Sequence, residues 1–406
     1  MKLLILTQYF PPEVGAPQNR LYELGIRLAK SGIQVDALTA MPNYPQMKIH
    51  KEYKNKFFFK EQLNDITVFR SFIYTSKSKG IASRLLNYFS FVFSSLLYGI
   101  FKLPSYDVIL CESPPLFLGI TGKILSSLKK SKFIFNVSDL WPESAEKLGI
   151  VTNKRVLRIA TILEEMLYKN SDLITGQTQG IVDDIKGRFP SKKVYWLPNG
   201  VDVSYYNPSL IKSDWRVRNG FKEDDLLLLY AGILGYAQGL EVVLKSANIT
   251  KENKKIRYIL LGSGPEKDRL IQINKELGLK NVYFFDGVPK SEMAFIIKAI
   301  DIALVPLRKL PLFEGAIPSK IFENLAMNKP LLLGVEGEAH KLFIEDGKTG
   351  LGFEPENAED LALKCQELFN SPDLLDKFAH NAREYVSKNF NRNDIAEKFQ
   401  KKLLEL

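Results

Sequence analysis

The segment DIALVPLRKLPLFEGAIPSKIFENLAMNKPLLLG, residues 301–334, contains in one continuous run the alternation that determines the fold. Apolar runs at 301–307 and 329–334 enclose a stretch in which apolar side chains recur at helical spacing after Pro318. This pattern predicts a strand, a loop, a helix that begins near Ser319, and a second strand. Such units, repeated along a chain, build an α/β protein with a doubly wound parallel sheet.

The remainder of the chain repeats this alternation in two halves. The predicted strands are 3–6, 35–40, 107–111, 132–137 and 173–176 in the first half, and 226–232, 257–262, 281–287, 301–307 and 329–334 in the second. At 406 residues, the chain is long for a single core. We therefore predict two Rossmann-like domains, residues 1–198 and 199–380, whose strand ends face a common cleft. A terminal helical segment, 381–406, is expected to pack back on one of them, with the first domain as the expected partner.

Composition narrows the class of protein. The hydrophobic content of 45% and the charged content of 25% are those of an ordinary globular protein. The only cysteines, Cys111 and Cys365, lie far apart in apolar segments, which suits a reducing compartment. The start of the chain has only four consecutive apolar residues, too few for the core of a signal peptide. These features predict a cytoplasmic protein.

The net charge of +10 favours an anionic partner and is unevenly distributed. Nine Lys or Arg residues lie in the basic stretch 48–84, and the uncharged run LLNYFSFVFSSLLYGIF, 85–101, follows directly. Three interpretations are open: a membrane span, a helix on the membrane surface, and an internal helix. We favour the surface helix with a basic surround for anionic lipid. The sequence contains no combination of aromatic and basic residues typical of a nucleic-acid-binding module, so a nucleic-acid partner is not favoured.

Lys320 lies in the first turn of the helix predicted after Pro318, and Glu323 follows one turn later on the same face. A cation in this position is disfavoured by the helix dipole by roughly 0.3–1 kcal/mol. The order Lys before Glu is also the less favourable one for a pair on one helical face. One explanation is a surface pair of no special function. The other is that an anion occupies the space in front of Lys320.

Glycine-rich loops follow several predicted strands. Gly15 lies in the loop TQYFPPEVGAPQ, where a glycine permits close approach of the backbone to a ligand, or merely turns the chain. The segments 231–239 and 262–267 are strand-to-helix turns whose free amides suit an anion. Neither GSGPEK nor DGKTG completes a dinucleotide or phosphate-loop motif. NAD and ATP binding are therefore not supported.

Acid–base candidates are few. None of the three histidines follows a predicted strand of the first domain, which leaves Asp139, just after the strand 132–137. Asp139 could instead cap the helix that follows, and the two roles are compatible. No Asp-x-Asp motif and no His/Cys cluster with ligand spacing occurs in the sequence. We therefore predict no metal site.

The motifs, in their order, resemble those of glycosyltransferase family 4. The resemblance covers nearly the whole chain through QYFPPEVGAP, LPNGVD, YAGILGYAQGLEVVL, LLGSGPE, IPSKIFENLAMNKP and EDGKTGLGFEPENAEDLA. It implies the GT-B fold and the transfer of a sugar from a nucleotide sugar, with retention of anomeric configuration and without a metal. The segment SDLWPES and the run 85–101 are most similar to the branch of bacterial fucosamine transferases of O-antigen and capsule assembly.

The resemblance also implies residue roles. Glu323 matches the glutamate that binds the ribose hydroxyls, and Lys320 is then placed to reach the donor diphosphate. Gly15 matches a loop that approaches the donor from the first domain. Asp139 falls where many members carry a histidine that touches the donor sugar. Further matches near the donor are Gly232, Gly262, Ser263, Gly264, Gly287 and Val288.

This chain departs from the family pattern at two places. The family often has two glutamates separated by seven residues, but eight lie between Glu314 and Glu323, and Gly315 takes the expected place. Whether Glu314 reaches the catalytic centre is therefore open. The loop 232–239 also lacks the Arg and Lys that many members use on the diphosphate. Arg308, Lys309 and Lys320 are the nearby cations that could replace them.

The predicted catalytic residues are accordingly Asp139, Lys320 and Glu314. The expected donor is a UDP-sugar, such as one of the UDP-N-acetylfucosamine type, and the expected acceptor is a polyprenyl-diphosphate-linked saccharide. The protein is expected on the inner face of the cytoplasmic membrane, bound through 85–101 and the basic stretch 48–84. Two alternatives remain: a nucleotide-sugar epimerase of the same fold, and a non-catalytic protein that binds the nucleotide sugar.

Overall fold

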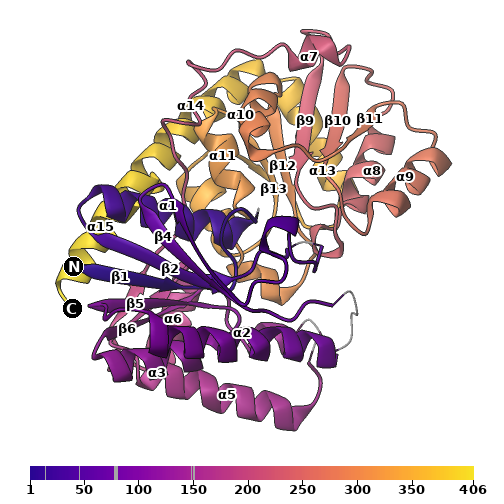
Figure 1. Ribbon diagram of the computed structural model, residues 1–406. Helices are drawn as coiled ribbons and strands as arrows, with labels where there is room; N and C mark the ends of the chain where they lie inside the picture. Colours follow the sequence, from indigo (N-terminus) through magenta and orange to yellow (C-terminus); the bar gives the residue numbers. More distant parts are fainter. Residues whose placement is uncertain (14, 45, 77–80, 148, 150) are drawn as a thin grey trace. The chain divides into compact units, whose positions relative to one another are not determined.

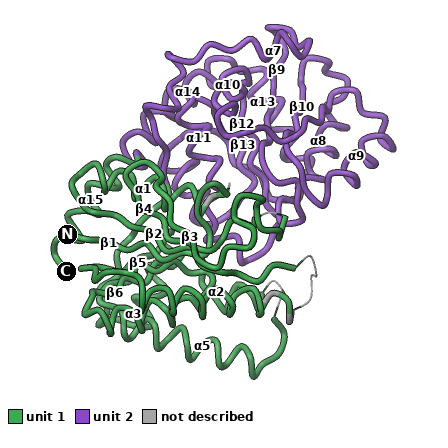
Figure 2. Tube along the Cα trace, in the orientation of Figure 1, with its two compact units in different colours: residues 1–199, 392–406 green, residues 200–391 purple. Residues whose placement is uncertain are grey.

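A computed structural model describes residues 1–406 except 14, 45, 77–80, 148 and 150. The chain divides into two compact units, which are drawn in different colours in Figure 2. Unit 1 comprises residues 1–199 and 392–406, and unit 2 comprises residues 200–391. Each unit is an α/β sheet with helices packed on it (Figure 1), which confirms the predicted fold class.

Unit 1 contains an eight-stranded sheet in the order β3-β4-β2-β1-β5-β6-β7-β8. All neighbours are parallel except β3 and β4, which form an antiparallel hairpin at one edge. The strands are β1 (Lys2–Leu6), β2 (Gln34–Ala40), β3 (Phe58–Leu63), β4 (Ile66–Ser71), β5 (Val108–Ser113), β6 (Lys132–Val137), β7 (Leu173–Gly176) and β8 (Val194–Trp196).

Helices cover both faces of this sheet. Alternate side chains of β1 point to opposite faces, so Leu3 and Ile5 pack in the core under α1 and α15, whereas Leu4 and Leu6 pack with α2 and α3. The helices of unit 1 are α1 (Ala16–Lys30), α2 (Ile81–Lys102), α3 (Leu118–Lys129), α4 (Glu143–Lys147), α5 (Lys154–Lys169), α6 (Gln179–Arg188) and α15 (Arg392–Leu404), with the 3-10 turn η1 (Lys51–Tyr53).

Unit 2 contains a six-stranded, wholly parallel sheet in the order β11-β10-β9-β12-β13-β14. Its strands are β9 (Leu226–Ala231), β10 (Ile256–Leu261), β11 (Val282–Phe285), β12 (Ile302–Pro306), β13 (Leu331–Gly334) and β14 (Gly350–Gly352). Its helices are α7 (Trp215–Arg218), α8 (Glu241–Ile249), α9 (Lys267–Glu276), α10 (Lys290–Ala299), α11 (Lys320–Ala326), α12 (Glu338–His340), α13 (Ala358–Phe369) and α14 (Pro372–Asn389). Two 3-10 turns, η2 (Tyr236–Gln238) and η3 (Pro311–Gly315), and the π-helix η4 (Lys341–Asp346) complete the unit.

The end of the chain is divided between the units. The sequence places one terminal segment at 381–406, but the structure has two helices there, α14 and α15. Residues 381–391 group with unit 2, and residues 392–406 group with unit 1. In unit 1, Phe399 of α15 is fully buried and stacks on Tyr195 of β8. The last helix is thus an integral part of the core of unit 1.

The basic stretch 48–84 contains the hairpin β3–β4, which the sequence analysis did not anticipate. One of its nine cations, Arg70, is fully buried and pairs with Glu61 of the neighbouring strand. Arg70 is therefore a core residue of the sheet, which corrects its assignment to a basic surface. Lys77 and Lys79 lie outside the described residues.

Candidate functional site

The carboxyl ends of β9 and β10 are brought into close contact by two glycines of unit 2. Gly232 (φ +145°) and Gly262 (φ +151°) adopt backbone angles that other residues rarely adopt. A Cβ on Gly262 would collide with the Gly232 carbonyl oxygen, so only glycine fits there. The Leu234 amide donates to the Ser263 carbonyl oxygen (2.9 Å), which fastens the two loops together. These loops form an edge of backbone with little side-chain cover.

The neighbouring loop segments complete this edge. Gly264 packs so closely on the Leu234 carbonyl that a Cβ would collide with it. Gly287, after β11, lies against Gly262 and Ser263, and the half-buried Val288 follows it. Unit 2 therefore brings the predicted donor-site residues of three strand-to-helix loops together at the carboxyl edge of its sheet.

Lys320, the first residue of α11, reaches this same edge. A Cβ built on Gly232 would lie 3.0 Å from the Lys320 Nζ. The ammonium lies 3.5 Å from the centroid of the Tyr230 ring, within reach of a cation–π interaction. Within the described residues, this ammonium has neither a hydrogen-bond acceptor nor an ion-pair partner. It is therefore a cation held in place by a ring face rather than by an anion.

Burial governs the charge state of Lys320. Desolvation lowers the pKa of Lys320 from 10.5 to about 7, and the smaller attraction of Glu323, one helical turn later, acts in the opposite direction. The ammonium form is thus only marginally stable at neutral pH in the absence of a ligand. An anion at this position would stabilise it.

Arg308 and Glu314 lie on the loop that follows β12. The Arg308 Nε donates to the Tyr236 carbonyl oxygen (2.9 Å), and the guanidinium lies 3.6 Å from the centroid of the Tyr236 ring. Glu314 is exposed and borders a small hollow. The hollow is lined by Arg308, Lys309, Leu310, Phe313, Glu314, Val335, Glu336 and Pro355. Glu314 therefore belongs to the hollow beside the β12 loop, whereas Lys320 lies against the β9 loop.

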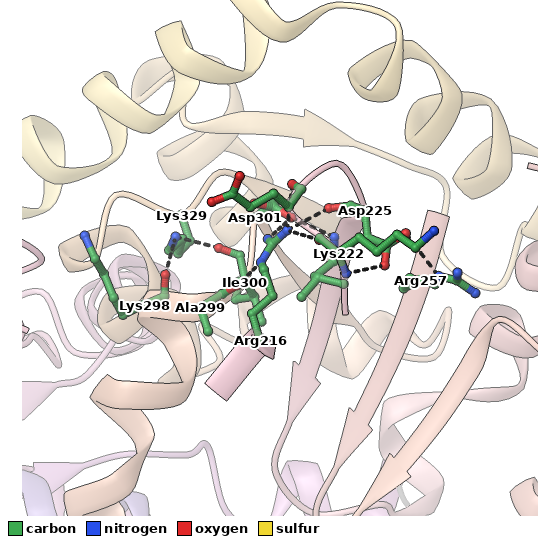
Figure 3. A network of polar contacts seen from close by, with 11 residues as sticks. Arg216, Lys222, Asp225, Arg257, Lys298, Ala299, Ile300, Asp301 and Lys329 are labelled. Atoms are coloured by element: carbon green, nitrogen blue, oxygen red, sulfur yellow. Dashed lines mark hydrogen bonds and ion pairs between the residues drawn. The ribbon is translucent and has the colours of Figure 1, made fainter. Parts of the chain in front are cut away.

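A second half-buried lysine, Lys329, lies at the opposite, amino-terminal edge of the same sheet. Its Nζ donates to the carbonyl oxygens of Lys298 (3.2 Å) and Ile300, at the end of α10. Arg216 pairs with Asp301 (2.6 Å) in the same network, which Figure 3 shows from close by. Burial lowers the pKa of Lys329 to about 8. This lysine has acceptors, and Lys320 has none among the described residues.

In unit 1, Asp139 follows β6 and is exposed. Partial desolvation raises the pKa of its carboxyl group, and the neighbouring Ser144 side chain and Leu140 amide oppose this rise. Gly15 immediately precedes α1 and has an extended backbone, and a Cβ there would collide with the Gln18 side chain.

A buried polar row lies beside Asp139, and the sequence analysis missed it. Glu112 of β5, Asn136 of β6 and Thr175 of β7 are in register on neighbouring strands. Glu112 accepts hydrogen bonds from the Asn136 amide and from the Arg20 guanidinium (2.6 Å), and Asn136 accepts one from Thr175. Burial raises the pKa of Glu112 despite the charge of Arg20. A carboxylate directly after the apolar run 107–111 was the available signal.

Several buried polar atoms near this row lack partners among the described residues. They are Gln8 Oε1, Gln18 Oε1, Arg20 Nη1 and Asn43 Oδ1, all in segments that follow β1 and β2. Buried polar atoms are nearly always paired, so such a concentration indicates bound water or a polar ligand. The carboxyl edge of unit 1 is therefore a second candidate binding region.

The helix α2 shows an unusual distribution of side chains. Its polar residues Asn87, Ser94 and Ser95 are buried and hydrogen-bonded, whereas large apolar residues face outward. The exposed set is Leu86, Phe89, Phe93 and Phe101, with exposed fractions between 44% and 75%. Further exposed apolar residues lie on α3 and α5, namely Ile124, Leu128, Val156, Ile159, Ile162 and Met166. By length and composition alone, residues 85–102 of α2 are long and apolar enough to cross a membrane.

The described residues contain no group of three or more His, Cys, Asp or Glu side chains that could hold a metal ion. The charged groups discussed above include Lys320 and Arg308 at the carboxyl edge of unit 2, and Asp139, Glu112 and Arg20 at that of unit 1. Unit 2 thus offers two cations and closely packed backbone at this edge, which suits an anionic ligand. Unit 1 offers carboxylates and amides, which suit hydroxyl groups.

Comparison with known proteins identifies relatives along the whole chain. A putative colanic acid biosynthesis glycosyl transferase, WcaI of Escherichia coli, is 24% identical over 412 residues, covering 98% of both chains. The structure of sucrose-phosphate synthase from Thermosynechococcus elongatus is similar, with a TM-score of 0.78, 18% identity and coverage of 100% of this chain and 98% of the other. Anabaena HepE, solved with UDP and glucose, has a TM-score of 0.72, 17% identity and full coverage of both chains.

Two family profiles match consecutive parts of the chain. Residues 18–205 match "Glycosyltransferase Family 4", and residues 211–385 match "Glycosyl transferases group 1". The first match lies mostly in unit 1 and the second in unit 2, and the two-unit fold agrees with the structural neighbours. Together the two matches span most of the chain, which is therefore a two-domain glycosyltransferase with the GT-B fold.

Proposed function

We propose that the protein transfers a sugar from a UDP-sugar to a hydroxyl of a lipid-linked saccharide, with retention of configuration and without a metal. The observation that carries this proposal is the Lys320 ammonium, which lies against Gly232 with no anion among the described residues to pair with it. The two glycosyltransferase matches and the UDP complex of HepE support a nucleotide-sugar donor. The name of WcaI supports a role in bacterial surface polysaccharide assembly, such as that of O-antigen or capsule.

In this proposal unit 2 holds the donor. Lys320 binds the diphosphate, Glu323 binds the ribose hydroxyls, and the loops at Gly232 and Gly262 approach the nucleotide through their backbone. Departure of the diphosphate builds negative charge, which preorganised donors stabilise where it develops. Arg308, already oriented by Tyr236, supplies a second cation beside the β12 loop. These groups take the place of a metal ion.

The reaction forms one bond and breaks one bond at the anomeric carbon. The acceptor oxygen bonds to this carbon while the bond to the diphosphate oxygen breaks. The proton of the acceptor hydroxyl passes to the departing phosphate, so no protein base is obligatory. Asp139 orients the sugar or the acceptor through its exposed carboxylate, and Glu314 is the corresponding carboxylate in the hollow of unit 2.

The acceptor proposal includes binding at the inner face of the cytoplasmic membrane. The outward Leu86, Phe89, Phe93 and Phe101 of α2 give the helix an apolar face of the kind that enters a bilayer interface. Exposed Lys51, Lys54, Lys56 and Lys60 in the preceding stretch suit anionic headgroups. A polyprenyl-diphosphate acceptor would reside in this membrane.

A product assay tests the transferase proposal. Wild-type protein is incubated with a panel of UDP-sugars and a bacterial membrane lipid extract, and new glycolipid is detected by mass spectrometry. We expect one UDP-sugar to give product in the wild type, and Lys320→Met to form that product about 10²–10³-fold more slowly. A sugar altered without any acceptor would instead indicate an epimerase. UDP binding without turnover of any sugar would indicate a non-catalytic protein.

Sedimentation with anionic vesicles tests the membrane proposal. The double variant Phe89→Ser/Phe93→Ser removes two outward rings of α2 without altering its buried polar face. We expect its bound fraction to fall severalfold. The control Leu210→Ser/Val217→Ser removes two exposed apolar side chains of unit 2 and should sediment like the wild type. Equal sedimentation of all three proteins would show that α2 does not mediate binding.

A further inference from the structure

The turn that carries Asp139 is fastened to a buried ion pair. The Ser138 hydroxyl donates to the Glu112 carboxylate and accepts a hydrogen bond from the Arg20 Nη2 (2.5 Å). The same Nη2 pairs with Glu112 at 2.6 Å. Arg20 and Glu112 are 7% and 2% exposed. Ser138 immediately precedes Asp139, and its side chain thus connects this turn to both α1 and β5.

This ion pair lies at the end of the apolar core rather than inside it. Val108 and Leu110 of β5 and Ile134 of β6 fill the face of the sheet under α1. Glu112 and Asn136 continue the same rows toward the carboxyl edge, because side chains two residues apart share a face. The polar row therefore replaces core packing only in the layer next to the candidate site.

Folding stability gives no reason to retain such a pair. Desolvation of two charges commonly cancels their attraction, and apolar residues of similar volume often serve equally well. A polar network is, however, more directional than apolar packing and specifies one geometry. Among the described residues, the Glu112 carboxylate accepts hydrogen bonds only from side chains at the carboxyl edge, namely Arg20, Asn136 and Ser138.

We propose that Arg20 and Glu112 are positioning residues that act through Ser138 to hold the Asp139 carboxylate in its working place. This inference rests on the proposed transferase function for its kinetic consequence, but its structural part does not. Without the Ser138 link, the turn after β6 is held by the Ser138 amide, which donates to Ser113, and by the contacts of α4. Small displacements of a substrate-orienting group reduce turnover strongly.

The variant Ser138→Ala tests this link because it removes the connection and leaves the ion pair intact. Ser131→Ala is the matched control: Ser131 precedes the other end of β6, and its hydroxyl donates to the Tyr106 carbonyl oxygen (2.7 Å). We expect kcat to fall about tenfold to a hundredfold in Ser138→Ala, with KM for the UDP-sugar changed less than twofold. Ser131→Ala should retain wild-type kcat.

A double-mutant cycle shows whether the effect passes through Asp139. If it does, Ser138→Ala adds little to the loss already caused by Asp139→Asn. Multiplicative losses in the double variant would overturn the proposal. An unchanged kcat in Ser138→Ala would overturn it as well.

Amide hydrogen exchange provides a readout that needs no activity. Residues 138–141 should exchange faster in Ser138→Ala and in Glu112→Gln than in the wild type and in Ser131→Ala. Unchanged exchange in both variants would overturn the positioning role, whatever the kinetics. A wild-type protein that transfers no sugar would contradict only the proposed function, since the exchange measurement still decides the present inference.

Discussion

Lys320 and Lys329 lie nine residues apart in unit 2 and differ in whether their ammonium groups have hydrogen-bond acceptors. Both are half-buried, and burial lowers the pKa of both, to about 7 and about 8. Lys329 donates to two backbone carbonyl oxygens at the amino-terminal edge of the sheet (Figure 3). Lys320, at the carboxyl edge, meets a tyrosine ring and a glycine. The fold provides acceptors for one desolvated ammonium and, among the described residues, provides none for the other.

This difference indicates which edge of the sheet binds an anionic ligand. A desolvated charge without a partner destabilises the folded state, and such strain is concentrated at functional sites. The amino-terminal edge has no such group in its drawn network, because Arg216 and Lys329 each have oxygen acceptors. The carboxyl edge is therefore the edge prepared for an anion, in agreement with the rule that ligands bind there in open α/β sheets.

The largest expected effect separates the two lysines by activity. Lys320→Met should lower kcat/KM for the UDP-sugar by about 10²–10³-fold, because a cation is lost where negative charge develops. Lys329→Met should remain within about fivefold of the wild type, since it lies at the opposite edge of the sheet. Initial rates of glycolipid formation measure both. Similar losses of kcat/KM in the two variants would contradict a special role of Lys320 in the reaction.

For the free energy of unfolding, the expected order of the two variants is reversed: Lys329→Met should be affected more than Lys320→Met. Lys329→Met leaves two carbonyl oxygens without their donor and should lower the free energy of unfolding by about 2 kcal/mol. Lys320→Met removes a desolvated charge and should leave it unchanged or raise it. Urea denaturation monitored by fluorescence measures both. A larger loss in Lys320→Met would mean that the Lys320 ammonium stabilises the apo protein.

A pH titration sharpens the comparison further. The pKa of Lys320 is about 7 without ligand, and a bound diphosphate stabilises the ammonium, so binding takes up a proton above this pH. UDP-sugar affinity should therefore fall about tenfold between pH 6.5 and 8.5. In Lys320→Met the same titration should be nearly flat, and in Lys329→Met it should follow the wild type. A flat wild-type profile would contradict a neutral-range pKa at Lys320.

Sequence reasoning succeeded where a signal is local. The apolar runs 226–232 and 301–307 became β9 and β12 with ends shifted by one residue, because a buried parallel strand is a continuous apolar run. The helix predicted near Ser319 begins at Lys320. Lys320 itself could be singled out because a cation in a first helical turn is unfavourable without a reason.

The parts that sequence reasoning missed depend on pairing between distant segments. The hairpin β3–β4 was not predicted, because residues 58–71 lie in a stretch rich in basic residues that was interpreted as surface. Arg20 and Glu112 are 92 positions apart, and the packing of α1 on the sheet brings them together. In α2, Asn87 and the serines seemed to weaken a membrane helix, but Asn87, Ser94 and Ser95 are buried. Phe89, Phe93 and Phe101 are exposed instead.

The central claim is that the Lys320 ammonium binds the diphosphate of the donor. Calorimetric titration of UDP into the wild type, Lys320→Met and Lys329→Met at pH 6.5 tests it most directly. At this pH most of the Lys320 population is charged in the wild type. The account predicts that UDP binds the wild type and Lys329→Met with affinities within twofold, and Lys320→Met at least about thirtyfold more weakly. Equal UDP affinity in Lys320→Met and the wild type would contradict it.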